Sequence, residues 1–383
     1  MRGRTVIAAC LCVAFVAGVA AAAPPPLPAE HLEVAHLPPL NAHWAFLFDY
    51  AEFSETDARV FVYDADHFRN LGQIDAGYYP GFTISPDSKT SAVATTYWSR
   101  GWHGTRTDVL EFTDNATLAP TTEVVLPKKR MQGPPTAFNI SYSPDQHFLY
   151  VANLTPAASL TVVDVAKGTV AAEIDTDGCV LVIPSGLRRV SSLCESGRLL
   201  TVTIGEDGRE GSRSLSAPFF NVDRDPIFVQ GIPFKNQVRF LSFLGDVYTV
   251  EFGAAEPSFQ PTWSLVTAAE RGKWRPGGAQ IAAYQPNLAR LYVPMHPGGE
   301  GTHKTGGNEI WVYDSGRHQR IARWPIDQKR YGAVIAVQVS QDASPVLYAV
   351  TENSALIVMD PMTGQIRHVE PKVGQTVWYV YTP

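Results

Sequence analysis

The residues that could do chemistry are densest in one stretch, MHPGGEGTHKTGGNEIWVYD, which spans residues 295–314. It places His296, Glu300, His303 and Lys304 within nine residues of a glycine-rich loop. Imidazoles and carboxylates bind metal ions, but zinc sites in loops usually add a further closely spaced ligand, and nothing else nearby supplies one. The loop joins two apolar strand patterns, and such loops often form binding surfaces. A metal site, a solvated loop and a partner-contacting loop therefore all stay open.

Two aromatic stretches are further candidates for a site. In DAGYYPGFTISPD, Tyr78 and Tyr79 stand between a glycine and a proline, on a turn that enters a strand. Adjacent side chains of an extended chain point in opposite directions, so one tyrosine can pack inward while the other stays available. Core packing of both is the alternative. The stretch TTYWSRGWHGTRTDVLEF clusters Trp and Arg, as interface hot spots do. Its candidates are Trp98, Arg100, Trp102, His103 and Arg106.

Composition and missing motifs exclude several classes of function. The sequence has no nucleophile elbow, HExxH zinc motif, P-loop or strand-linked GxGxxG fingerprint, and no segment nominates a catalytic triad. Its formal net charge is −6, and no basic patch with interleaved aromatic residues occurs, which argues against a nucleic-acid partner. With 45% hydrophobic and 18% charged residues, the chain can bury a large core.

A repeated strand pattern indicates the elements that position these residues. An alternating strand ends at a turn residue seven times, at intervals of about 40 to 60 residues, the range of propeller blades. The turn residues are Asp64, Asp114, Asp164, Gly205, Gly253, Asp314 and Asp360. A second element, strand–turn–strand, precedes many copies, as in ISYSPDQHFLYVAN. We therefore expect an all-β fold, a seven-bladed β-propeller of four-stranded antiparallel blades.

The two ends of the expected propeller can lie in one blade. The strand patterns HWAFLFDY, residues 43–50, and TVWYVYTP, residues 376–383, are both apolar and alternating, so N- and C-terminal strands close the ring in this prediction. An eight-bladed ring and a two-sheet sandwich are the competing architectures. The regular period argues against the sandwich.

The N-terminal segment predicts export. Arg2 and Arg4 precede an apolar run, and small residues with A-x-A cleavage choices follow it. An uncleaved membrane anchor is the alternative. We expect a signal peptide at residues 1–23, an N-terminal extension at 24–42 and the propeller at 43–383.

Export changes how the four cysteines are interpreted. Cys10 and Cys12 leave with the signal peptide, so Cys179 and Cys194 remain as an even pair in an oxidising compartment. A structural disulfide is the expected state of such a pair. A reactive thiol or a metal-binding pair is the alternative, and no histidine lies near either cysteine in sequence to support it.

Several of these stretches resemble one family, the heavy subunits of the periplasmic quinoprotein amine dehydrogenases of the methylamine and aromatic amine types. The matching segments include DAGYYPGFTISPD, SRGWHGTRTDVLEF, the cysteine pair, and the long run from KWRPGG through HPGGEGTHK to IWVYD. The resemblance extends over most of the chain from His43 onward. The combination of WRPGG with HPGGEGTHK is its most distinctive part.

The resemblance implies a specific role. A heavy subunit of this kind pairs with a small, disulfide-rich light subunit in a heterotetramer of two heavy and two light chains. The light subunit carries the tryptophan tryptophylquinone cofactor and the catalytic base. Primary amine is oxidised to aldehyde and ammonia, and electrons pass to a periplasmic copper protein or c-type cytochrome. The mature chain, with two cysteines, lacks the light-subunit cysteine pattern, so we expect no cofactor, metal or catalytic residue in this chain.

The resemblance also assigns expected site residues. The substrate-channel gate falls at Tyr78, with Tyr79 beside it, and an aromatic residue of the family gains a hydroxyl here. The expected subunit-interface residues are Trp98, Arg100, Trp102, His103, Arg275, His296, Glu300, His303 and Lys304. Two other functions compete with this one: a free-standing exported propeller enzyme of the metal-dependent lactonase type, and a scaffold whose light partner has been lost.

Overall fold

The computed structural model describes residues 35–52, 56–133, 135–253 and 256–383. The predicted signal peptide, and the predicted extension as far as residue 34, lie outside the described residues. Residues 36–383 form one compact unit, which is described here by itself. In the described part of the chain, no helix is long and apolar enough to cross a membrane.

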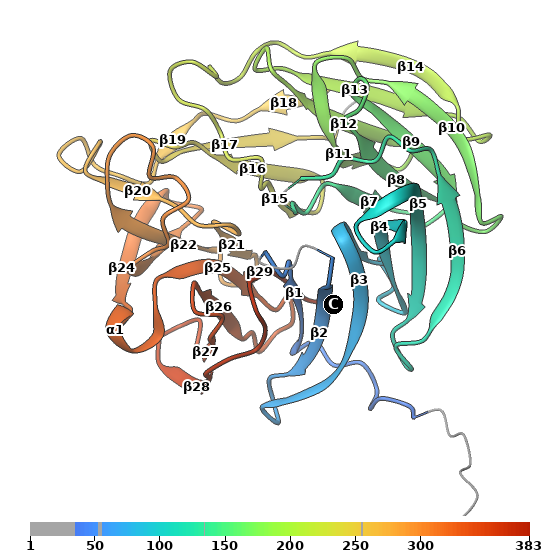
Figure 1. Ribbon diagram of the computed structural model, residues 1–383. Coiled ribbons are helices and arrows are strands. Elements are labelled where there is room, and N and C mark those ends of the chain that lie inside the picture. Colours follow the sequence, from blue (N-terminus) through green and yellow to red (C-terminus); the bar gives the residue numbers. More distant parts are fainter. Residues whose placement is uncertain (1–34, 53–55, 134, 254–255) are drawn as a thin grey trace, which may run out of the picture. The chain divides into compact units, whose positions relative to one another are not determined.

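The unit is built almost entirely from antiparallel strands (Figure 1). The first sheet has the order β29-β1-β2-β3-β4-β5-β6. Its strands are β1 (Trp44–Asp49), β2 (Ala58–Asp64), β3 (Arg69–Ile84), β4 (Thr90–Arg100), β5 (His103–Asp114), β6 (Pro120–Leu126) and β29 (Val377–Tyr381). The second sheet contains β7 (Ile140–Tyr142), β8 (Phe148–Asn153), β9 (Ser159–Asp164) and β10 (Thr169–Asp175). The third contains β11 (Cys179–Gly186), β12 (Arg189–Cys194), β13 (Leu199–Ile204) and β14 (Glu210–Leu215).

Three more sheets follow in the described residues. The fourth contains β15 (Ile232–Phe234), β16 (Gln237–Leu241), β17 (Asp246–Glu251), β18 (Ser258–Phe259) and β19 (Trp263–Ser264). The fifth contains β20 (Trp274–Pro276), β21 (Ala283–Gln285), β22 (Arg290–Pro297), β23 (Glu309–Asp314) and β24 (Gln319–Pro325). The short helix α1 (Gln328–Tyr331) leads to the sixth, which contains β25 (Val334–Val339), β26 (Leu347–Thr351), β27 (Leu356–Met359) and β28 (Ile366–Glu370). The expected all-β class of four-stranded antiparallel units is confirmed.

The aspartates of the sequence repeat close the hairpins that follow their strands. Asp64 Oδ1 accepts hydrogen bonds from the backbone N–H groups of Asp66 and His67. Asp314 Oδ1 and Asp360 Oδ1 likewise accept hydrogen bonds from the backbone N–H groups two and three residues further along the chain. An aspartate at a strand end thus supplies the acceptor for the first turn N–H groups, which explains why the pattern recurs.

The apolar faces of neighbouring sheets pack against one another. One cluster joins Leu110 and Phe112 of β5 to Leu149 of β8, and another joins Tyr292 of β22 to Leu347 of β26. All five side chains are at most 6% exposed. Alternating strand residues therefore fill the spaces between sheets, which fixes the sheets relative to each other within this unit.

The innermost strands of the sheets line one cavity of about 480 Å³. Residues of β3, β7, β11, β15, β16, β21, β25 and β29 all contribute to its wall. Inside it, the Gln280 side chain donates to Val380 O and accepts from Val380 N, each at 2.9 Å. The glutamine thereby ties the C-terminal strand to a segment 100 residues earlier in the chain.

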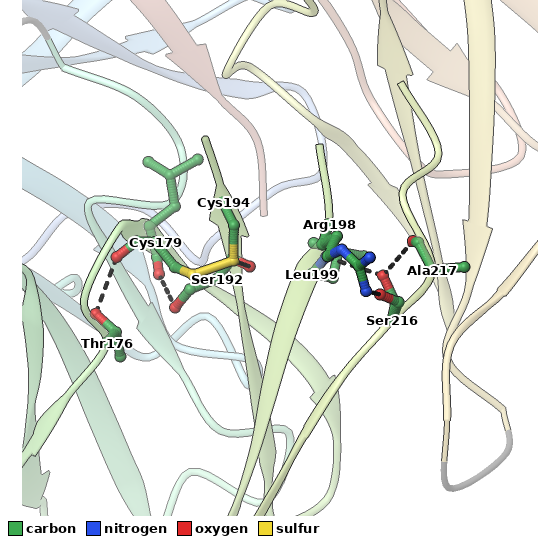
Figure 2. Close-up of a disulfide and its surroundings, with 9 residues drawn as sticks. Thr176, Cys179, Ser192, Cys194, Arg198, Leu199, Ser216 and Ala217 are labelled. Carbon is green, nitrogen blue, oxygen red and sulfur yellow. Dashed lines mark hydrogen bonds between the residues drawn. A yellow bond between two sulfur atoms is a disulfide. The ribbon is translucent and has the colours of Figure 1, made fainter. Parts of the chain in front are cut away.

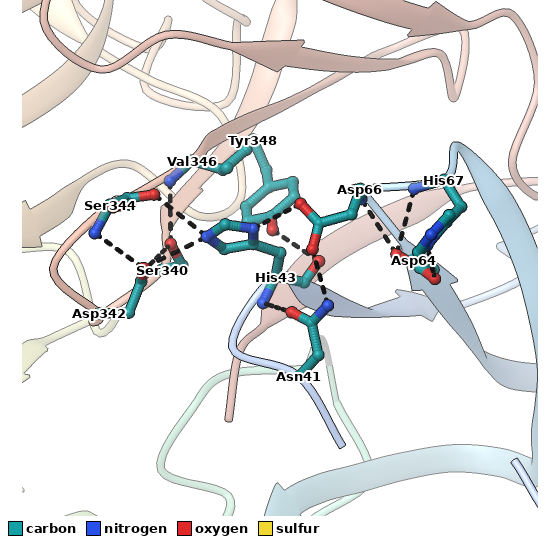
Figure 3. A network of polar contacts seen from close by, with 10 residues as sticks. All are labelled: Asn41, His43, Asp64, Asp66, His67, Ser340, Asp342, Ser344, Val346 and Tyr348. Carbon is teal, nitrogen blue, oxygen red and sulfur yellow. Dashed lines mark hydrogen bonds and ion pairs between the residues drawn. The ribbon is translucent and has the colours of Figure 1, made fainter. Parts of the chain in front are cut away.

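The two ends of the described unit meet in the first sheet. β29 pairs antiparallel with β1, from Phe46 opposite Tyr381 to Asp49 opposite Val377. A cluster of polar contacts around His43, named here the His43 clamp, lies just before β1 (Figure 3). His43, just before β1, contacts Asp66 at 2.6 Å and Asp342 at 3.3 Å, which belong to turns of the first and sixth sheets. Tyr348 of β26 donates to His43 O at 2.9 Å.

The expected disulfide joins Cys179 of β11 to Cys194 of β12 (Figure 2). The two residues are direct partners across the antiparallel pair, with their Cα atoms 3.9 Å apart. Both are buried within the cluster between the second and third sheets. The bridge therefore fastens two strands of one sheet and does not link separate sheets.

Candidate functional site

The two tyrosines of the predicted gate lie on an irregular turn of β3. The pairing of β3 with β4 shifts register between Tyr78 and Gly81. Gly77 and Tyr79 have positive φ values of 69° and 42°, a conformation that glycine tolerates and tyrosine adopts at a cost. Because the alternation of an extended strand is broken here, both tyrosine side chains are half-buried.

A row of aromatic rings leads away from this turn. Tyr78 and Tyr79 meet edge to face with ring centroids 4.7 Å apart. Tyr79 meets Tyr50 in the same way at 5.3 Å, and Tyr50 contacts Trp378 at 5.1 Å. Rings in such arrangements stabilise one another beyond their buried area. The row links β3 to the segment after β1 and to the closing strand β29.

The row ends at an apolar pocket of about 290 Å³, named here the Trp378 pocket. Most of its wall is hydrophobic, and two potentially basic side chains stand in it. The lining residues are Ile227, Phe228, Val229, Gln230, Phe243, Gly278, Ala279, His303, Lys304, Ile335 and Trp378. The wall of the pocket thus comes from the fourth, fifth and sixth sheets and from the closing strand β29. It includes His303 and Lys304 of the glycine-rich loop that follows His296.

His303 is the only histidine of that loop that reaches the pocket. Its ring stacks on Phe243, with centroids 4.3 Å apart and planes 14° from parallel. Burial lowers the pKa of His303, and the neighbouring Lys304 lowers it further. The imidazole is therefore neutral near pH 7, and Lys304 is the charged group at this edge of the pocket.

His296 does not lie on the loop surface, contrary to the sequence-based expectation. It belongs to β22, is 1% exposed, and lies beneath Gly277 and Gly298. Burial lowers the pKa of this histidine as well. The glycine-rich sequence that resembled an open loop instead lets the backbone pass close over a buried imidazole. Arg275 of β20 is half-buried and lies opposite His296 in the pairing of β20 with β22, whereas Glu300 is exposed.

The Trp–Arg cluster forms the tip of the β4–β5 hairpin. Arg100 pairs with His103, and Trp102 at the tip is 74% exposed. Trp98, further down β4, is half-buried. Since Tyr78 pairs with Thr96 of β4, the hairpin continues the strand that flanks the tyrosine turn. The hairpin therefore projects beside the aromatic row.

Three residues of this site carried no functional prediction. Tyr50 and Trp378 lie in segments that read only as strands, and Arg130, whose guanidinium binds the carbonyl oxygens of Tyr78 and Tyr79, lies in the stretch PKKRMQG, which carried no prediction. Aromatic residues near both chain ends were the one available signal for the first two. Among the described residues, no group of three or more His, Cys, Asp or Glu side chains is placed to hold a metal ion.

Comparison with known proteins gives one consistent family. The family model of the methylamine dehydrogenase heavy chain matches residues 41–380. The methylamine dehydrogenase heavy chain of Methylorubrum extorquens is 26% identical over 332 residues, which cover 85% of this chain and 79% of that protein. That of Methylophilus methylotrophus is 24% identical over 342 residues, which cover 88% and 82%.

A solved structure supports the architecture separately. The β-propeller domain of Cps50 from Myceliophteria thermophila aligns with a TM-score of 0.54 at 9% identity, covering 87% of this chain and 99% of that one. At this identity the likeness concerns the fold alone. The family model, in contrast, spans nearly all of the described unit, including the tyrosine turn, the β4–β5 hairpin and the Trp378 pocket. This chain therefore belongs to the methylamine dehydrogenase heavy chain family.

Proposed function

We propose that this chain is the heavy, cofactor-free subunit of a periplasmic dehydrogenase that oxidises primary amines to aldehyde and ammonia. The observation that carries the proposal is the apolar Trp378 pocket at the end of the aromatic row, in a chain of this family. An apolar pocket and an exposed tryptophan such as Trp102 are each typical of protein–protein interfaces. The partner is a small, disulfide-rich light subunit, in an assembly of two heavy and two light chains.

The light subunit supplies the oxidation chemistry through its tryptophan tryptophylquinone. A copper protein or c-type cytochrome then accepts the electrons. This chain contributes the walls of the substrate path: Tyr78 and Tyr79 narrow its mouth and exclude water. A ring with a hydroxyl group at the mouth limits the size of the amine and offers it a hydrogen-bond partner.

The remaining parts of the proposal concern export and architecture. Residues 1–23 form a signal peptide, residues 24–42 an extension, and residues 43–383 a seven-bladed propeller closed by β29 and β1. Two observations support seven blades in the described unit. The long strand β3 pairs with β2 over one half and with β4 over the other, so the seven-stranded sheet counts as two blades. The first sheet also contributes two strands, β3 and β29, to the wall of the central cavity, and each of the other five sheets contributes at least one.

Native capture tests the proposal. The chain is isolated from the periplasm by gentle affinity capture, each co-purifying chain is weighed, and the visible spectrum is recorded before and after a primary amine is added. A small partner with a quinone band that bleaches on amine addition is the expected result. Amine oxidation by the isolated chain, or a colourless chain with a bound metal, would contradict it.

The gate is tested by Tyr78→Ala in the assembled complex. Removing the ring widens the mouth, so KM for bulky amines relative to small ones should change by about 10-fold or more, since a single methylene in an apolar pocket already changes discrimination by about 10-fold. Tyr248→Ala, which removes a half-buried tyrosine from β17 beside Phe219, is the matched control. An amine profile shared by both variants and the unaltered complex would rule the gate out.

A further inference from the structure

A single buried arginine holds the backbone of the tyrosine turn. Arg130 is 3% exposed and lies in the segment between β6 and β7. Its Nη1 donates to Tyr79 O at 2.5 Å, and its Nη2 donates to Tyr78 O at 3.0 Å. One guanidinium group therefore binds both carbonyl oxygens of the turn, at a point where the ladder between β3 and β4 is interrupted.

The same arginine is tied to the neighbouring strand. Arg130 Nη2 also donates to Thr96 Oγ1 at 2.7 Å, and Thr96 donates to Asp108 Oδ1 at 2.8 Å. Asp108 is 0% exposed and forms a two-pronged ion pair with Arg106, with contacts of 2.8 and 2.6 Å. The Arg106 side chain in turn donates to Arg130 O at 3.3 Å. The turn is thus anchored to β4 and β5 through a continuous buried network.

Arg130 occupies an unusual environment for a charged group. Among the described residues no carboxylate pairs with it directly, and its anchors are neutral oxygen atoms. Burial lowers the pKa of Arg130 to about 10, against the opposing charge of Asp108, so the guanidinium stays protonated near neutral pH. A buried charge is unfavourable unless hydrogen bonds compensate it. Here three of the four compensating hydrogen bonds are donated to the turn that carries the two tyrosines and to Thr96 of the flanking strand β4.

We propose that Arg130 is a positioning residue for the substrate gate, which it controls by fixing the Tyr78–Tyr79 backbone through their carbonyl oxygens. The inference rests on the proposed function of that turn. Without the guanidinium, the carbonyl oxygens of Tyr78 and Tyr79 lose the N–H groups that hold them, the positive-φ conformation at Tyr79 is no longer supported, and the tyrosine rings sample other positions at the channel mouth.

The test uses Arg130→Met, which keeps the volume of the side chain and removes its donors, and Arg130→Lys, which keeps the charge and one donor direction. Arg239→Met is the matched control. Arg239 is also buried, donates to Gln237 at 3.2 Å and lies 4.1 Å over the Tyr284 ring, away from the turn. Each variant is prepared as the full chain and as the assembled complex.

Two readouts separate positioning from general stability. Hydrogen exchange of the segment 74–84 in Arg130→Met should be accelerated by about 10-fold relative to Arg239→Met, as expected for loss of charge-assisted hydrogen bonds. In the complex, KM for bulky amines should shift by a few-fold while kcat changes less, and Arg130→Lys should restore part of the shift. Exchange equal to that of the control would overturn the inference.

The gate variant makes the two possible failures distinguishable. If Tyr78→Ala changes the amine profile but Arg130→Met loosens the turn without moving KM, the gate stands and the positioning role is wrong. If Tyr78→Ala leaves the profile unchanged, the gate itself fails, and the positioning role fails with it. A shift in both variants, with accelerated exchange only in Arg130→Met and not in Arg239→Met, supports the inference.

Discussion

His43 and Arg130 perform similar tasks in different ways. Each is a basic side chain that joins segments far apart in sequence: His43 connects the entry to β1 with turns of the first and sixth sheets, and Arg130 connects the segment before β7 with β3 and β4. The anchors of His43 are the carboxylates of Asp66 and Asp342, which are partly exposed. The anchors of Arg130 are buried neutral oxygens.

The difference shows how the kind of anchor decides what a contact responds to. The His43 clamp depends on a proton, because an imidazole bonds two carboxylates through both nitrogens only when both nitrogens are protonated. The Arg130 network keeps its charge at all ordinary pH values and depends on geometry instead. A clamp of the first kind responds to the solution, whereas one of the second kind fixes a shape.

The largest effect is expected where the buried network loses its carboxylate. Asp108→Ala leaves the guanidinium of Arg106 without its counter-ion and deprives Thr96 of its acceptor, at a point where the carboxylate is fully buried and the Arg106 side chain is only 19% exposed. Breaking a buried pair in this way costs about 3–5 kcal/mol in the free energy of unfolding. Denaturant unfolding measures it. Asp57→Ala, which removes the exposed partner of Arg59, should change stability by less than about 0.5 kcal/mol. Equal losses would show that burial of the network is unimportant.

A smaller loss is expected for the clamp. His43→Ala removes contacts to Asp66 and Asp342, both of which lie partly in solvent. Screening by water limits such contacts, so the expected loss is about 1 kcal/mol at pH 6. Thermal unfolding of the two proteins side by side gives the value. A loss of stability as large as that of Asp108→Ala would show that the partly exposed contacts of His43 stabilise the fold as much as the buried network does.

The pH dependence sharpens the same contrast. Burial alone lowers the pKa of His43, but the hydrogen bonds and charges of Asp66 and Asp342 together outweigh it and raise the pKa above its ordinary value. The stabilisation is therefore complete below the unfolded value of about 6.5 and is lost as pH rises through the folded pKa. The stability difference between His43→Ala and the unaltered chain should shrink above that point.

The smallest effect on stability is expected at the hairpin tip. Trp102 is 74% exposed, so Trp102→Ala should change the free energy of unfolding by less than about 0.5 kcal/mol. If this residue is an anchor for the light subunit, the same variant should weaken assembly by about 10-fold or more, which titration of the two purified subunits measures. An unchanged assembly constant would place the interface elsewhere.

Local hydrogen bonding explains why the strand pattern could be predicted. Asp64, Asp314 and Asp360 bond N–H groups only two and three residues away, so their effect is readable from neighbouring letters. The Cys179–Cys194 pair could also be predicted, because two of the four cysteines lie in the predicted signal peptide and only one pairing is then left.

The candidate site depends on distant contacts, and sequence reasoning was weaker there. Trp378 meets Tyr50 and the pocket of His303 only because β29 returns to β1. Arg130 follows two lysines, and its neighbours in sequence do not indicate that it is buried against the tyrosine turn of β3. His296 looked like part of an open loop for the opposite reason, because the glycines around it admit close backbone packing.

The pairing of β29 with β1 also bears on how the protein is made. β1 keeps one backbone edge unpaired until β29 has been synthesised, because β29 is its partner on that side. An open strand edge invites pairing with other chains. Premature termination at any codon before this strand would leave that edge open. Translation through β29 is thus a condition for a paired β1 edge, and a product that ends earlier exposes an open strand edge to chaperones and proteases.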